Sequence, residues 1–83
     1  MNIIALIDGS ISDNGFWRVC EQYVNPMDMN PRSEADVKLC GVFVHEADAE
    51  RYAKQRGRCS RLPVFYFDGM EGRLIQPSDQ PCL

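Results

Sequence analysis

The chain has 83 residues, of which 45% are hydrophobic and 25% are charged, and its formal net charge is -3 at pH 7. This composition excludes a disordered chain, and the length leaves room for only one domain. The longest purely apolar run, Ile3 to Ile7, is too short to span a membrane, and no basic signal-peptide segment precedes it. We therefore expect a cytoplasmic protein without membrane contact.

The first expected element is a strand over residues 2–8, because a short apolar run closed by Asp8-Gly9 is typical of a strand buried on both faces. Residues 14–24 follow, and their apolar side chains have the i, i+3, i+4, i+7, i+8 spacing that predicts a helix. These side chains are Phe16, Val19, Cys20, Tyr23 and Val24. A hairpin turned at residues 13–15 is the alternative.

Residues 25–36 contain two prolines and read as a long irregular connection, a kind of segment in which binding often occurs. Met27 and Met29 could form a soft contact surface there. Residues 37–44 then read as a second strand. Strict alternation would place Val37, Leu39, Gly41 and Phe43 on one face and Cys40, Val42 and Val44 on the other.

The best-defined element is a helix from Glu46 to Arg56, with acidic residues in its first turns, basic residues in its last turns and Gly57 placed to terminate it. Residues 62–67 form a third strand, residues 69–72 a turn, and residues 73–76 a fourth strand. The predicted order is βαβαββ, an α/β fold with a four-stranded mixed sheet and two helices; α+β is the alternative class. Residues 1–76 would form the single domain, and residues 77–83 a loosely ordered tail.

A helix ending in glycine, followed by the segment Leu62 to Gly69 and a returning strand, resembles the second half of thioredoxin-fold proteins. The resemblance covers residues 37–76 and implies a thioredoxin-like fold in which Pro63 is cis and faces the active site. In place of the family's cysteine motif this chain has residues 8–15, which contain no cysteine. The resemblance therefore supports the fold and argues against dithiol redox activity.

Charge is concentrated in residues 51–61, which hold five of the nine basic side chains and no acidic one. Such a patch on an acidic chain is typical of a recognition surface. Its members are Arg51, Lys54, Arg56, Arg58 and Arg61. Helix stability explains the first three, whereas Arg58 and Arg61 lie beyond the expected helix end.

The four cysteines lack the close ligand pairs of a metal site, so we expect no metal and no other cofactor. In a reducing compartment all four are expected to be free. Cys20 and Cys40 fall in apolar patterns and are expected in the core. Cys59, between Arg58 and Arg61, is a candidate reactive thiol, because positive charge favours a thiolate.

Catalytic residues are not evident. Asp8 and Asp68 each follow a strand, but an antiparallel first and third strand would place them at opposite ends of the sheet. His45, before the helix, is expected as a weak N-cap or an exposed ring. The sequence therefore favours a non-enzymatic protein.

Three function classes remain. The first is a protein-binding module that acts by surface occlusion; in size and charge the chain resembles small phage-encoded inhibitors of host defence, including anti-CRISPR proteins that block nucleic-acid-processing complexes. The second is a thioredoxin-like single-cysteine thiol protein. The third is nucleic-acid binding through residues 51–61, with Tyr52 or Tyr66 for stacking, which the net charge of -3 disfavours.

Acidic residues could also contribute to partner binding by imitating phosphate groups. Three lie in the long connection and two near the first predicted helix: Asp28, Glu34, Asp36, Asp8 and Asp13. A protein partner is therefore expected to use the basic patch, this acidic set or the two methionines.

Overall fold

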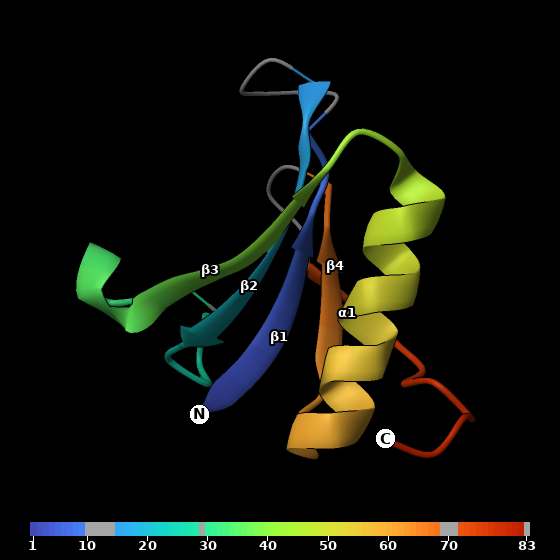
Figure 1. Ribbon diagram of the computed structural model, residues 1–83. Helices are drawn as coiled ribbons and strands as arrows, with labels where there is room; N and C mark the ends of the chain where they lie inside the picture. Colours follow the sequence, from blue (N-terminus) through green and yellow to red (C-terminus); the bar gives the residue numbers. More distant parts are fainter. Residues whose placement is uncertain (10–14, 29, 69–71, 83) are drawn as a thin grey trace.

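The computed structural model describes residues 1–9, 15–28, 30–68 and 72–82. The strands are β1 (Asn2–Ile7), β2 (Trp17–Tyr23), β3 (Val37–Phe43), β4 (Val64–Phe67) and β5 (Gly72–Ile75). The helices in the described residues are the 3₁₀ helix η2 (Glu34–Asp36) and the α-helix α1 (Glu46–Ser60). The strands form one sheet in the order β3-β2-β1-β4-β5, and α1 lies across one of its faces (Figure 1).

The prediction of a helix at residues 14–24 is wrong, because this segment contains strand β2. It pairs antiparallel with both β1 and β3 and is therefore covered along both edges. Trp17 and Val19 join the core under α1, whereas Cys20 joins a second core on the opposite face. A strand buried on both faces loses its polar alternation, which is why its apolar spacing imitated a helix. The antiparallel β1–β2 pair agrees with the hairpin alternative; its turn lies outside the described residues.

Strand β1 is central, as predicted, and the mixed α/β class is confirmed. Its parallel neighbour, however, is β4 and not the strand at residues 37–43. The described residues hold five strands and one α-helix, against four strands and two helices predicted. The strand-helix-strand unit that a thioredoxin-like start requires is therefore missing, while the antiparallel pair β4–β5 is present as expected.

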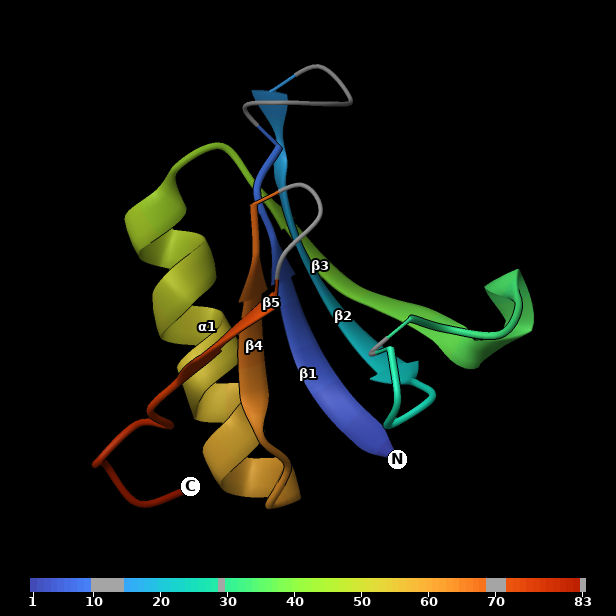
Figure 2. The ribbon, with the colours of Figure 1, turned by 180° about the vertical axis from the view of Figure 1, so that it is seen from behind.

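The two faces of the sheet carry separate apolar clusters. The α1 face buries Ile4, Leu6 and Val64 against Ala49 and Ala53 of the helix. The opposite face buries a smaller set, and in Figure 2 no helix covers it. Three large apolar side chains stay more than half exposed on this face: Leu39 (55%), Val42 (52%) and Leu74 (63%).

A β-bulge changes the predicted faces of β3. Val19 pairs with Gly41 and Cys20 with Leu39, so Cys40 is an extra residue between them. Beyond the bulge the alternation reverses, and Val42 therefore lies on the same face as Leu39. Strict alternation had placed these two side chains on opposite faces.

Helix α1 begins at Glu46, as predicted, but continues past Gly57 to Ser60. Gly57 does not terminate the helix. It is buried, and a Cβ there would overlap the side chain of Val64, so glycine allows α1 to approach β4 closely. The helix ends instead at Arg61, which has the left-handed φ of 57° and donates its backbone N–H to the Gly57 carbonyl.

Candidate functional site

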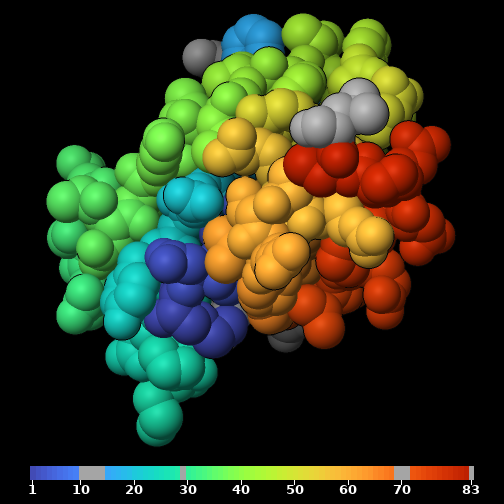
Figure 3. Space-filling view, turned by 60° about the horizontal axis from the view of Figure 1, so that its bottom comes forward, coloured from blue at the N-terminus to red at the C-terminus, as the bar shows by residue number. Residues whose placement is uncertain are grey.

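The strongest candidate site is a cleft of about 650 Å³ where the end of α1 meets the C-terminal tail. Figure 3 shows the tail in red against the end of α1 and the start of β4 in orange. The cleft is lined mainly by apolar groups, with two arginines and a disulfide at its rim. The lining residues used below are Arg58, Arg61, Leu62, Pro63, Ile75, Pro77, Cys59 and Cys82.

Arg61 is the most unusual residue of this cleft. A left-handed conformation at a helix end normally selects glycine, because the Cβ of any other residue is strained there. Arg61 nevertheless occupies the position, is exposed, and makes no ion pair or side-chain hydrogen bond with any residue that the structure describes. Non-glycine residues in this conformation concentrate at functional sites.

Arg58 lies in the last turn of α1, not beyond it, so the predicted boundary was wrong here. A basic side chain in that turn complements the helix dipole, which gives Arg58 a partial structural reason. It is exposed and, like Arg61, has no ion-pair partner in the described part of the chain. Both arginines therefore line the cleft without an ion-pair partner among the residues that the structure describes.

Cys59 is not a free thiol. It forms a disulfide with Cys82, and the Cα atoms of the two residues are 5.1 Å apart. The β4–β5 pair returns the chain beside the end of α1, which a separation of 23 residues in sequence does not reveal. Cys20 and Cys40 are free; Cys20 is buried and Cys40 half-buried, as predicted. Burial raises the pKa of the Cys20 thiol, with a smaller opposing effect of Arg18.

The tail itself is exposed but attached. Besides the disulfide, it is held by a hydrogen bond from the Ser78 N–H to the Lys54 carbonyl, 3.2 Å long. It forms one wall of the cleft and also borders a second cleft of about 1020 Å³ beside Phe43 and Tyr52. No tail residue belongs to either core cluster of the described residues.

The remaining basic residues of the predicted patch are paired within the helix. Arg51 contacts Asp48 at 3.8 Å and Lys54 contacts Glu50 at 3.0 Å. Arg56 is half-buried and lies over the Tyr52 ring, 6.0 Å from its centroid. Within the described part of the chain, the unpaired positive charge of the predicted patch therefore lies at its end, at Arg58 and Arg61.

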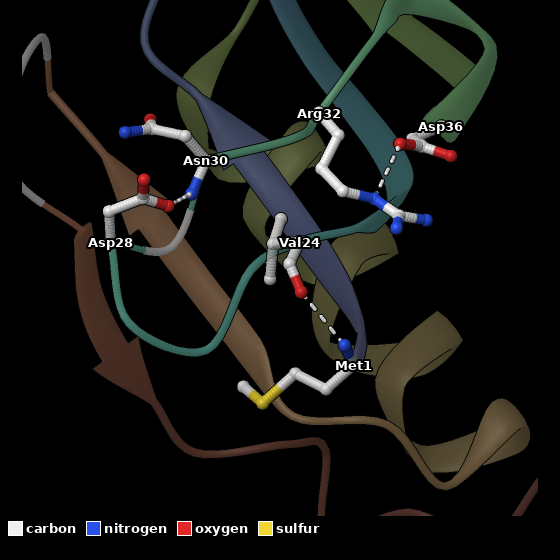
Figure 4. A network of polar contacts seen from close by, with 6 residues as sticks. All are labelled: Met1, Val24, Asp28, Asn30, Arg32 and Asp36. Carbon is white, nitrogen blue, oxygen red and sulfur yellow. Dashed lines mark hydrogen bonds and ion pairs between the residues drawn. The ribbon is translucent and has the colours of Figure 1, made fainter.

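The members of the predicted acidic set in the long connection, Asp28, Glu34 and Asp36, lie towards the β3 edge of the sheet (Figure 1). Figure 4 shows that Asp28 accepts the Asn30 N–H at 3.0 Å and that Asp36 pairs with Arg32 at 3.6 Å. Glu34 is exposed in η2. Met27 is 91% exposed, while Met29 and Asp13 lie outside the described residues. The structure thus does not join these residues to the basic end of α1.

A second polar cluster lies where β1 and β4 end. Because these strands are parallel, Asp8 and Asp68 lie at the same end of the sheet, contrary to prediction. The Tyr66 hydroxyl donates to Asp8 Oδ2 at 3.3 Å. Burial and the nearby carboxylates, first Asp8, raise the pKa of Tyr66. His45 is the N-cap residue of α1 without a side-chain capping bond.

The structure does not support this second cluster as a metal site, and it does not support Pro63 as the cis proline of a thioredoxin-like centre. No group of three or more His, Cys, Asp or Glu suited to a metal occurs in the described residues. The Pro63 peptide bond is trans, since no cis peptide bond occurs among the described residues.

Among the described residues no helix is long and apolar enough to cross a membrane.

No protein-family model matches this chain, and no curated protein or solved structure matches it either. The residues of the cleft are therefore the basis for a functional proposal. Sequence reasoning found the two arginines but missed the cleft and the disulfide. A cysteine next to the last position, following two tail prolines, was the only available signal for the pairing.

Proposed function

We propose that this chain is a small non-enzymatic protein-binding module whose cleft at the end of α1 receives an acidic, partly apolar segment of a protein partner. The observation that carries this proposal is Arg61, an exposed arginine without an ion-pair partner in the described residues, at a backbone position that favours glycine. Arg58 supplies a second positive charge, and Leu62, Pro63 and Ile75 supply apolar contact area. Arginine combined with apolar contacts is typical of binding hot spots.

A protein partner is favoured over nucleic acid for two reasons. The net charge of -3 opposes nonspecific phosphate binding. The tyrosines expected to stack on bases are also engaged, because Tyr52 donates to the Cys40 carbonyl at 3.3 Å and Tyr66 donates to Asp8. Inhibition of a host-defence or nucleic-acid-processing complex by occlusion is the biological role that we propose for such a module.

Fluorescence anisotropy with two probes of equal charge tests this proposal at physiological salt. The probes are a labelled peptide of alternating Glu and Leu residues and a labelled single-stranded oligonucleotide. We expect the peptide to bind and the oligonucleotide not to bind. Arg58→Glu with Arg61→Glu should weaken peptide binding by about tenfold or more. The free energy of unfolding should fall by about 1 kcal/mol or less, because Glu at position 58 opposes the helix dipole.

The matched control is Arg32→Glu with Lys38→Glu, which changes the net charge equally but lies near the opposite edge of the sheet. It should bind the peptide like the unmodified chain. Equal loss in both double variants would show that only overall charge matters. Oligonucleotide binding that the Arg58/Arg61 variant abolishes would contradict the proposal and favour phosphate recognition.

Arg61→Gly separates the side chain from the backbone conformation. Glycine relieves the left-handed strain, so the free energy of unfolding should rise by about 0.5–1 kcal/mol. Peptide binding should nevertheless fall, because a positive charge is lost from the rim of the cleft. Chemical denaturation and anisotropy on the same sample measure both effects; a variant that gains stability and keeps full affinity would remove Arg61 from the site.

A further inference from the structure

The Cys59–Cys82 disulfide lies at the surface and not in the core. Both residues are exposed, and the tail that Cys82 anchors contributes no member to the two core clusters of the described residues. Exposed disulfides are typically the labile or regulatory ones, whereas structural disulfides resist reduction. The position of this bond therefore favours exchange with external thiols.

Few of the described polar contacts join the tail to α1. From residue 76 to residue 82 only Ser78 is half-buried, and its N–H makes the one backbone hydrogen bond between the tail and α1 that the structure describes. This one backbone hydrogen bond to α1 offsets far less than the conformational entropy lost by ordering seven residues. Opening the disulfide should consequently release the tail while the sheet and α1 remain folded.

We infer that Cys59–Cys82 is a reversible thiol–disulfide exchange site that accepts two electrons from a dithiol and thereby detaches residues 76–82 from α1. Release removes Pro77 and Cys82 as a wall of the cleft beside Arg58 and Arg61. The bond thus controls the shape of the candidate binding site. This last consequence rests on the proposed function, whereas the exchange and the release do not.

Reduction of the disulfide takes two successive attacks by the dithiol. A thiolate of the dithiol attacks Cys82 Sγ, the bond between the two protein sulfurs breaks, and Cys59 leaves as a thiolate that takes a proton from water. The second thiol of the reductant then attacks the mixed disulfide, releases Cys82 as a thiol and leaves the reductant as a cyclic disulfide. Gln55 Nε2 lies 3.5 Å from Cys59 Sγ as a hydrogen-bond donor, which favours Cys59 as the leaving sulfur.

The test uses dithiothreitol on the intact folded chain, followed by cleavage with a protease that cuts before Asp79. Reduction should expose the Ser78–Asp79 bond and raise its cleavage rate by about tenfold or more, because cleavage follows the population of the released tail. Cys82→Ser should behave like the reduced chain without any reductant. Cys40→Ser, which keeps the disulfide, is the matched control and should behave like the unmodified chain.

Gln55→Met keeps the size of the side chain but removes the donor near Cys59. It should slow reduction by dithiothreitol by about threefold to tenfold, as expected for loss of one hydrogen bond. Tail cleavage in the fully reduced variant should be unchanged. An unaltered reduction rate would remove Gln55 from the exchange step.

Three results would overturn the inference: a disulfide that dithiothreitol reduces only after the chain unfolds, a tail equally protected in both states, or loss of the near-ultraviolet signal of Trp17 on reduction. The acidic peptide should bind the reduced chain about tenfold more weakly than the oxidised chain. Unchanged binding despite tail release would refute control of the cleft. No peptide binding in either state would refute the proposed function alone, and the cleavage result would still decide the exchange site.

Discussion

Tyr66 joins two parts of the molecule that are far apart in sequence. Its ring packs near Trp17, with centroids 5.9 Å apart, and its hydroxyl donates to Asp8. The Arg73 guanidinium carbon also lies over the ring, 5.0 Å from its centroid. The raised pKa of Tyr66 reflects burial first and the Asp8 carboxylate second. This hydroxyl therefore stays protonated at pH values where an exposed tyrosine ionises.

We predict that Asp8→Asn lowers the pKa of Tyr66 toward its ordinary value, because the carboxylate that opposes phenolate formation is removed. Ultraviolet absorbance during an alkaline titration measures the shift, and Tyr66→Phe identifies which transition belongs to Tyr66. An unchanged transition in Asp8→Asn would mean that the contact has no electrostatic effect. The folded pKa lies above the unfolded value of about 10, so this contribution to stability is complete below pH 10 and is lost as the pH rises through the folded pKa.

Among the elements, α1 depends on one residue for its distance from the sheet. Gly57 is buried against Val64, and no Cβ can be added without moving that side chain. Alanine at this position would gain about 1 kcal/mol of helix propensity, while overpacking typically costs 1–3 kcal/mol. The packing effect is expected to dominate.

We predict that Gly57→Ala lowers the free energy of unfolding by about 1 kcal/mol, and that Val64→Ala in the same chain recovers part of this loss. Chemical denaturation of the two single variants and the double variant measures their coupling. Ser60→Ala, in the same last turn but exposed, should be close to neutral. A stabilising Gly57→Ala without coupling to Val64 would show that glycine is not needed for close packing.

The sequence allowed some elements to be predicted and hid others for physical reasons. Strand β1 and the start of α1 carry strong local signals, an apolar run and a polarised helix start, and both predictions are confirmed. Strand β2 carries a misleading pattern because both of its faces are covered. The end of α1 was predicted too early in the chain, because Gly57 is needed for packing against Val64 and not for ending the helix. A local sequence pattern does not show such a packing role.

At the scale of the whole molecule, the site depends on contacts between distant segments. The two arginines were visible in the sequence, but their cleft requires the β4–β5 pair and the disulfided tail. The predicted separation of Asp8 and Asp68 failed for a similar reason, since it followed from a wrong strand direction. Pairings between distant strands set both features, and no local spacing encodes them.

We predict that Cys59→Ser with Cys82→Ser lowers the free energy of unfolding by about 1 kcal/mol, although closing a loop of this length is worth roughly 3 kcal/mol in the chain-entropy model. The difference arises because the folded variant regains the conformational entropy of its tail. Denaturant titration of the double variant, with Cys40→Ser as the control, measures the loss in the free energy of unfolding. A loss of the full 3 kcal/mol would indicate a tail that stays ordered without the bond.

The parallel pairing of β1 with β4 also sets the order in which the chain can fold. Strands β1, β2 and β3 are consecutive and antiparallel, so each can pair with its neighbour after closing a loop much shorter than the one between β1 and β4. The β1–β4 pairing joins Ile4 to Val64 and requires the whole intervening chain, including α1, to be gathered first. Loop-closure entropy makes such a contact slow to form. The meander of β1 to β3 is therefore the earliest sheet, and until β4 docks, the β1 edge remains open to strands of other molecules.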